Sequence, residues 1–178
     1  MQDKHVIIRQ AQPEDVPSIA TIWFKGWQDG HLGHVPDALI QARTQESFLA
    51  RASARTAETT VAAIGGEVAG FVMVVDDEVE QVYVAAGHRG SGVADPLLAE
   101  AERLVAEQQY EEAWLAVVAG NLRARRFYER HGWRDTGAFD YVAKGASQPI
   151  VVPSHRYVKR VREWPAPIRP GATQSIDH

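Results

Sequence analysis

The chain has 178 residues and no cysteine, which excludes disulfides, zinc–thiolate sites and cysteine nucleophiles. Hydrophobic residues make up 45% and charged residues 24%, and the formal net charge is -4. This is the balance of an ordinary globular domain, and it argues against a nucleic-acid partner, which needs a concentrated basic face. Because no signal peptide and no apolar run of membrane length is visible, we expect a cytoplasmic protein without membrane contact.

Hydrophobic periodicity and turn residues predict the elements. In chain order they are a strand over 5–11, a helix over 13–25, a helix over 44–55, strands over 59–64, 67–77 and 78–86, a helix over 95–109, a strand over 112–120, a helix over 121–131 and a strand pair over 133–145 and 150–161. Glycines and a proline in segment 26–37 are expected to end the first helix. Gly65 and Gly66 between two apolar runs are typical of a β-hairpin.

This order indicates an α/β or α+β fold in which helices pack against a mixed sheet. We expect one domain over residues 1–163. The segment 164–178 is proline-rich and lacks periodicity, so it is predicted to be a loosely held tail.

A glycine-rich turn lies between the strand 78–86 and the helix 95–109, with the sequence RGSGVA from Arg89 to Ala94. Small residues there allow a ligand close to the backbone, and free amides at a helix start attract phosphates. Arg89 adds a permanent positive charge. No Gly-Lys-Ser/Thr follows, and the dinucleotide fingerprint is incomplete. The turn therefore predicts a phosphate-bearing ligand, with a purely structural connection as the alternative.

The turn matches the pattern Arg/Gln-x-x-Gly-x-Gly/Ala through Arg89, Gly92 and Ala94. Further along, Asn121 opens a helix, Tyr128 follows seven residues later, and a Gly-Trp pair comes after it. With these two motifs and its element order, the chain over residues 5–162 resembles the GNAT superfamily of N-acetyltransferases. The resemblance implies a mixed, mostly antiparallel seven-stranded sheet with about four helices, whose fourth and fifth strands splay around acetyl-CoA.

The resemblance also implies which residues bind acetyl-CoA. The expected pyrophosphate site consists of Arg89, Gly90, Ser91, Gly92, Val93 and Ala94. The backbone of Val82, Tyr83 and Val84 is expected to bind the pantetheine arm as an added strand would. Asn121 and Tyr128 complete the expected cofactor site. No metal is expected.

Direct attack of an amine on the thioester requires a neutral amine, good positioning and a stabilised thiolate. In similar enzymes the tyrosine at the place of Tyr128 protonates or hydrogen-bonds the sulfur; the alternative is a core aromatic residue. Strand alternation predicts that Glu78, Glu80, Val82 and Val84 share one face. Either glutamate could take the proton of the amine, and the sequence does not rank them.

The acceptor is expected to be a primary amine of a small molecule or peptide, bound by Trp27, His31, Glu78 and Glu80. The acidic run that Asp76 and Asp77 form with these glutamates favours a cationic amine. The last strand pair offers an edge for a homodimer. The alternative function is a catalytically silent sensor of acyl-CoA with the same fold, and an acyl donor longer than acetyl is left open.

Overall fold

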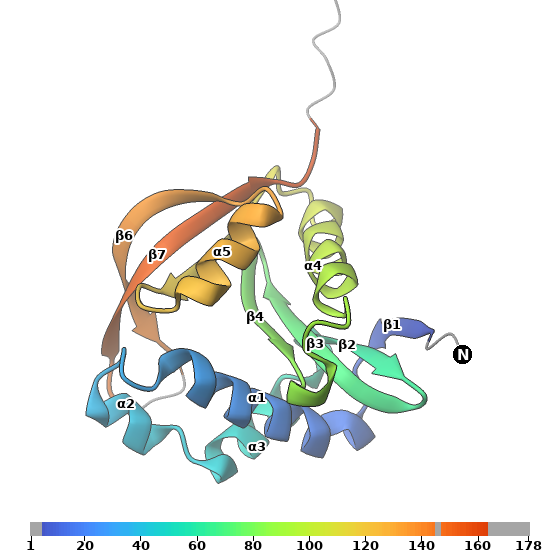
Figure 1. Cartoon of the computed structure of the whole chain (residues 1–178), viewed down its shortest axis with the longest axis horizontal. Coiled ribbons are helices and arrows are strands. Elements are labelled where there is room, and N and C mark those ends of the chain that lie inside the picture. The colour runs from blue at the N-terminus through green and yellow to red at the C-terminus, as the bar shows by residue number, and fades with distance from the viewer. Residues whose placement is uncertain (1–4, 145–146, 164–178) are drawn as a thin grey trace, which may run out of the picture.

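The computed structural model of the chain describes residues 5–144 and 147–163. Within them, one seven-stranded sheet packs with five α-helices (Figure 1). The elements have these bounds: β1 (Val6–Gln10), α1 (Val16–His31), α2 (Asp37–Ala42), α3 (Gln45–Ala54), β2 (Thr59–Ile64), β3 (Glu67–Val75), β4 (Glu78–Val84), α4 (Ala94–Glu107), β5 (Glu112–Val118), α5 (Leu122–Arg130), β6 (Arg134–Ala143) and β7 (Ile150–Arg160). The segment predicted to be a tail, 164–178, lies outside the described residues.

The strands follow the order β1-β2-β3-β4-β5-β7-β6, and the central pair, β4 with β5, is parallel while the other pairs are antiparallel. β4 and β5 share a single register pair, Glu78 opposite Trp114. Beyond that pair the edge of β4 that faces β5 is not bonded to it, so the backbone of 82–84 borders a gap. The predicted mixed sheet with splayed fourth and fifth strands is thereby confirmed.

Both faces of the sheet are buried under helices, as the alternation along β3 demonstrates. Val72 and Val74 belong to the core shared with α4 and α5, whereas Phe71 and Met73 belong to the core shared with α1 and α3. In Figure 1, α1, α2 and α3 gather on one side of the molecule, and α4 and α5 lie on the other. Trp23 packs edge-on against Phe71, with ring centroids 5.8 Å apart, as a fully buried core residue.

The first helix is longer than the sequence predicts, because α1 continues through Gly26 and Gly30. These glycines allow close packing: a Cβ at Gly26 would lie 2.4 Å from Cδ1 of Tyr83, and one at Gly30 would lie 2.8 Å from Nδ2 of Asn121. Tertiary contact therefore outweighs the helix-propensity cost of about 1 kcal/mol per glycine. The six residues of α2 are too few to show periodicity, and that helix was not predicted.

β4 contains a bulge at Glu80. Gln81 lies opposite Met73 and Val79 lies opposite Val74, so Glu80 has no register partner on β3. An inserted residue shifts the alternation of every side chain that follows it.

The bulge corrects the prediction that Glu78, Glu80, Val82 and Val84 share one face. Val82 and Val84 pack with Val79 on the core of α4 and α5. Glu80 instead contacts the end of α3 on the opposite face. The two glutamates therefore remain together, but the valines lie on the other side of the sheet.

Leu97 of α4 is fully buried in the core between that helix and the sheet. We predict that Leu97→Ala lowers the free energy of unfolding by about 2–5 kcal/mol, because the lost contacts leave a cavity. Urea unfolding checks this, with Leu49→Ala as the control, since Leu49 is 47% exposed on α3. A loss at Leu97 no larger than that at Leu49 would contradict the assigned core.

Candidate active site

The turn before α4 adopts a backbone that suits glycine at two positions. The φ angle is +75° at Gly90 and +83° at Gly92, a region that L side chains rarely adopt. The N–H groups of Gly92 and Val93 find no acceptor among the described residues, and no side chain caps the helix that follows. The turn thus offers free donors beside a helix N-terminus, which fits an anionic group such as a pyrophosphate.

Two residues of the turn have partners of their own. Nη2 of Arg89 lies 2.6 Å from Oδ2 of Asp29, so this ion pair joins the turn to α1. The N–H and the hydroxyl of Ser91 both donate to the carbonyl of His88. Ser91 therefore acts within the turn and does not line the neighbouring cleft.

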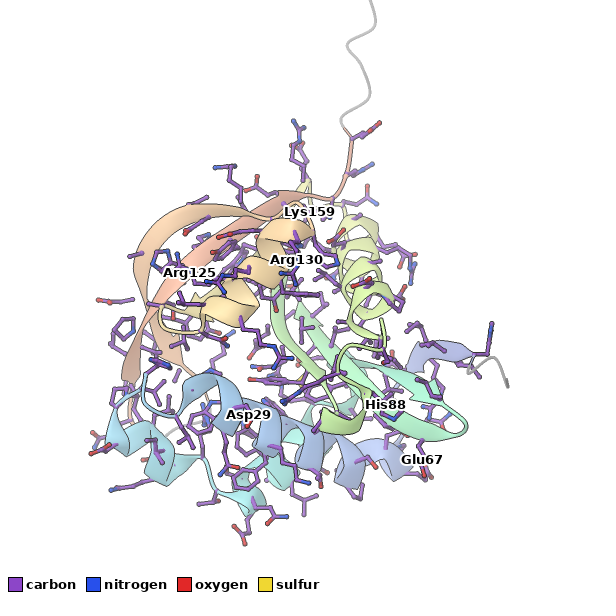
Figure 2. The ribbon with its side chains drawn as sticks, viewed as in Figure 1. Asp29, Glu67, His88, Arg125, Arg130 and Lys159 are labelled. Carbon is purple, nitrogen blue, oxygen red and sulfur yellow. The ribbon has the colours of Figure 1, made fainter. Side chains whose placement is uncertain are left out.

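A cleft of about 550 Å³, here called the donor cleft, is lined by α1, β4, the turn and α5. It brings together these residues predicted to bind acetyl-CoA: Val82, Tyr83, Val84, Arg89, Gly90, Gly92, Val93, Ala94, Asn121 and Tyr128. The prediction missed four basic side chains on its wall: His88, Arg123, Arg130 and His131. Figure 2 labels Arg130 on α5, His88 beside the turn and Asp29 on α1. The dense basic run of α5 was the available sequence signal.

The position of α5 fixes those of Asn121 and Tyr128. Oδ1 of Asn121 accepts from the N–H of Ala124 at 3.2 Å and caps the helix. Tyr128 is buried against Trp133 and Tyr157, yet its hydroxyl bonds to no described residue. Burial raises the pKa of that hydroxyl, so it remains a protonated donor at neutral pH.

A second cavity, of about 150 Å³ and here called the acceptor cavity, adjoins the donor cleft. The two share these lining residues: Gly26, Gly30, Val82, Tyr83, Asn121, Ala124 and Tyr128. The residues predicted to bind the acceptor, Trp27, His31, Glu78 and Glu80, all line it. Tyr128 therefore lies at the boundary of the two spaces.

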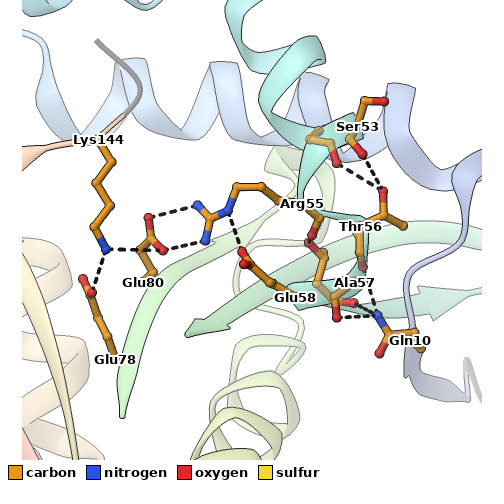
Figure 3. A network of polar contacts seen from close by, with 11 residues as sticks. Gln10, Ser53, Arg55, Thr56, Ala57, Glu58, Glu78, Glu80 and Lys144 are labelled. Carbon is orange, nitrogen blue, oxygen red and sulfur yellow. Dashed lines mark hydrogen bonds and ion pairs between the residues drawn. The ribbon is translucent and has the colours of Figure 1, made fainter. Parts of the chain in front are cut away.

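The side chains of both glutamates of the acceptor cavity are buried and make polar contacts (Figure 3). Glu80 receives two hydrogen bonds from the guanidinium of Arg55, with Nη1 to Oε1 at 2.9 Å, and Nζ of Lys144 lies 3.8 Å away. Glu78 accepts from the hydroxyl of Tyr141 at 2.8 Å and from Lys144 at 3.0 Å. Burial, followed by the charge of Glu78, raises the pKa of Tyr141, which keeps that hydroxyl a donor.

Three of the four acidic residues of the run at 76–80 have partners within the protein. Asp77 accepts from the indole of Trp114 at 3.1 Å, and the carboxylates of Glu78 and Glu80 are paired with cations. Long-range pairing, which the local sequence does not show, therefore gives both glutamates of this run a cationic partner within the protein.

Two arginines missed by the sequence analysis also line the acceptor cavity. Arg43 is 6% exposed and donates through Nη2 to the carbonyl of Lys144. Burial lowers the pKa of its guanidinium. Arg51 lies over the ring of Trp23, 4.3 Å from its centroid. Burial, together with repulsion from Arg43 and Arg55, lowers the pKa of Arg51 to about 10.

His31 stacks on Trp27, with ring centroids 5.0 Å apart. Its Nδ1 lies 2.9 Å from the carbonyl oxygen of Trp27. Because a carbonyl can only accept, Nδ1 carries the proton and Nε2 keeps its lone pair. Burial lowers the pKa of His31 to about 4, so the ring is neutral at physiological pH. The nearby His34 packs against Gly120 and lines neither cavity.

The model of the Acetyltransferase (GNAT) family matches residues 18–133, which is more than half of the chain. The chain therefore belongs to the GNAT acetyltransferase family. Uncharacterized N-acetyltransferases of Mycobacterium bovis and Mycobacterium tuberculosis are 30% identical to it over 77 residues. That alignment covers 40% of this chain and 49% of each relative, so the chain spans about half the length of the curated relatives it matches.

Solved structures confirm the fold. The PaiA N-acetyltransferase from Thermoplasma acidophilum, in complex with coenzyme A, is similar with a TM-score of 0.65 at 16% identity, over 88% of this chain and 99% of that chain. For yncA from Salmonella typhimurium, with its cofactor acetyl-CoA, the TM-score is 0.65 at 20% identity, over 92% and 98%. Among the described residues of this chain, no helix combines the length and apolarity needed to cross a membrane.

The neutral state of His31 makes stability depend on pH. The pKa of His31 is about 4 in the folded chain, below the ordinary 6.5. The contribution of His31 to the free energy of unfolding is therefore complete above pH 6.5 and is lost as the pH falls toward 4. We predict that His31→Gln flattens the decline of unfolding free energy over this interval by up to about 1.4 kcal/mol per pH unit. Urea unfolding across this range checks it, and an NMR titration midpoint of His31 near 6.5 would contradict the assignment.

Proposed function

We propose that the protein transfers the acetyl group of acetyl-CoA to the primary amine of a small molecule or peptide, within a ternary complex. The observation that carries the proposal is the meeting of the donor cleft and the acceptor cavity at Tyr128. One space ends at a turn with free N–H donors, and the other contains buried charged groups. A donor and an acceptor bound in these two spaces would meet beside a buried hydroxyl donor.

The residues that would hold acetyl-CoA lie along the donor cleft. The N–H groups of Gly92 and Val93 and the basic side chains at its wall suit the pyrophosphate. The edge of β4 over 82–84, which is not paired with β5, suits the amides of the pantetheine arm. When bound, acetyl-CoA supplies a thioester that a neutral amine can attack, with formation of an amide and loss of the thiol.

Tyr128 is proposed to donate a hydrogen bond to the sulfur as negative charge develops there. Its raised pKa lies well above that of an ordinary thiol, near 8.5. The hydroxyl of Tyr128 therefore favours a hydrogen bond to the sulfur over transfer of its proton. Charge that develops in a buried site is stabilised strongly by such a fixed donor.

Glu78 is the better of the two glutamates for the proton of the amine. Glu80 is fixed by two hydrogen bonds from Arg55, and its side chain is 2% exposed. The cation on Glu78 is Lys144, whose side chain is 52% exposed and free to exchange with solvent. Glu78 can therefore release Lys144 and accept from an incoming amine at lower cost.

A sensor of acyl-CoA without activity remains the second candidate. The donor cleft alone would satisfy that function. The separate acceptor cavity with its buried polar groups favours transfer, because a sensor has no need of a second ligand space.

The first prediction for this function concerns the turn. Gly92→Trp should abolish the stabilisation of the protein by acetyl-CoA in a thermal-shift assay, and calorimetry should show at least about a tenfold loss of affinity. The reason is that the side chain would enter the space beside the free amides. The rate of thiol release from acetyl-CoA with a panel of amines should fall together with this affinity.

Gly66→Trp is the matched control, because Gly66 also has positive φ, +84°, and a Cβ there would meet nothing within 4 Å. Gly66→Trp should lower the free energy of unfolding about as much as Gly92→Trp does and leave the affinity for acetyl-CoA unchanged. Normal binding by Gly92→Trp would remove the turn from the cofactor site.

The second prediction is that Tyr128→Phe lowers kcat by about tenfold or more while the affinity for acetyl-CoA changes little. The hydroxyl is proposed to act chiefly on charge that exists in the transition state. Steady-state kinetics and calorimetry measure the two effects. Tyr157→Phe is the control, since this neighbouring buried tyrosine lines neither cavity. An unchanged kcat in Tyr128→Phe would exclude the hydroxyl from the mechanism.

A further inference from the structure

The charges of the acceptor cavity do not balance. Among the described residues that line it, Arg43, Arg51 and Lys144 are cations, whereas Glu78 and Glu80 are anions. Arg55 pairs with Glu80 from outside the lining. Both anions are therefore already occupied, and the positive charge of the two lining arginines has no carboxylate partner within the described part of the chain.

Two buried donor atoms also lack acceptors. In the described residues, Nη1 of Arg43 and Nε1 of Trp23 are the side-chain polar atoms that are buried without a hydrogen-bond partner. Both residues line the acceptor cavity. A guanidinium and an indole N–H can only donate, so only an acceptor can satisfy them. A buried cation without such a partner destabilises the protein, and a bound anionic ligand would offset that cost.

Arg43 is positioned for this role. It follows α2 directly, and its Nη2 is fixed on the carbonyl of Lys144. The second arm of a planar guanidinium held in this way is oriented in advance, which suits the geometry of a carboxylate. Arg43 lines the acceptor cavity and not the donor cleft, so its ligand belongs to the acceptor.

We propose that the acceptor is a small free amino acid, whose carboxylate is bound by Arg43 while its amine faces Glu78. The proposal rests on the acetyl transfer proposed above. The cavity of about 150 Å³ suits a small molecule with opposite charges close together. A polyamine or an aminoglycoside would add cations to a cavity that already has an excess of them.

The test measures thiol release from acetyl-CoA with the twenty L-amino acids. The best substrate is then compared with its carboxamide, its decarboxylated amine and a tripeptide amide that begins with it. We expect each loss of the carboxylate to lower kcat/KM by about tenfold or more. Equal turnover of the carboxamide, the amine or the tripeptide amide would overturn the proposal.

Variants assign the preference to Arg43. Arg43→Gln should lower kcat/KM for the amino acid by about tenfold or more and that for the carboxamide by a smaller factor, so that the preference for the carboxylate shrinks. Arg43→Lys keeps the charge without the fork and should keep part of the preference. Arg103→Gln, on the exposed face of α4, should change neither value. A preference that persists in Arg43→Gln would overturn the role of Arg43.

Calorimetry with CoA-saturated protein separates this proposal from the proposed function. Amino-acid binding that Arg43→Gln abolishes, without any acetyl transfer, would reject the transferase and support the carboxylate site. Transfer to amines without regard to their carboxylate would support the transferase and reject the carboxylate site. If neither amino-acid binding nor transfer occurs while acetyl-CoA binds, both are rejected.

Discussion

The separation of β4 from β5 is the constraint on which the rest of the site depends. The two strands are joined at one register pair, Glu78 with Trp114, and beyond it β4 bonds only to β3. A parallel pair needs a crossover, and here the crossover is α4, which begins at the glycine-rich turn. The same divergence therefore leaves an unpaired strand edge and places a helix N-terminus beside it. A ligand with both amides and phosphates fits this combination.

Close contacts from outside the sheet border the opening between the two strands. α1 lies against the ring of Tyr83 through Gly26 and against the side chain of Asn121 through Gly30. These contacts link the first helix to β4 and to the residue that caps α5. Side chains larger than hydrogen at these two positions would push α1 away from the meeting point of the two cavities. The first helix is thus part of the wall of the site as well as of the core.

The bulge at Glu80 divides β4 into two halves with different surroundings. Before it, Glu78 lies among Tyr141 and Lys144, and Glu80 itself is held by Arg55. After the bulge, the backbone of residues 82–84 borders the donor cleft. Without the inserted residue, the side chains beyond 80 would alternate in the opposite phase. One strand therefore contributes charged side chains to the acceptor cavity and an unpaired backbone edge to the donor cleft.

The sequence by itself determined the order of most elements, the hairpin at Gly65 and Gly66, and the turn with Arg89, Gly90 and Gly92. These features depend on local physics, namely periodicity, positive φ and helix ends, so neighbouring residues suffice to predict them. Only the tertiary structure decided that Gly26 and Gly30 lie within a helix, because the contacts that favour them come from β4 and α5.

The character of the acceptor cavity was also decided only by the tertiary structure. An acidic run at 76–80 predicted attraction for cations, but Arg55 and Lys144 neutralise its glutamates from 25 and 66 residues away. Arg43 had no local signal, since it is buried beside the carbonyl of Lys144, 101 residues along the chain. Charge in a folded protein acts through distance in space, and a linear pattern records only distance along the chain.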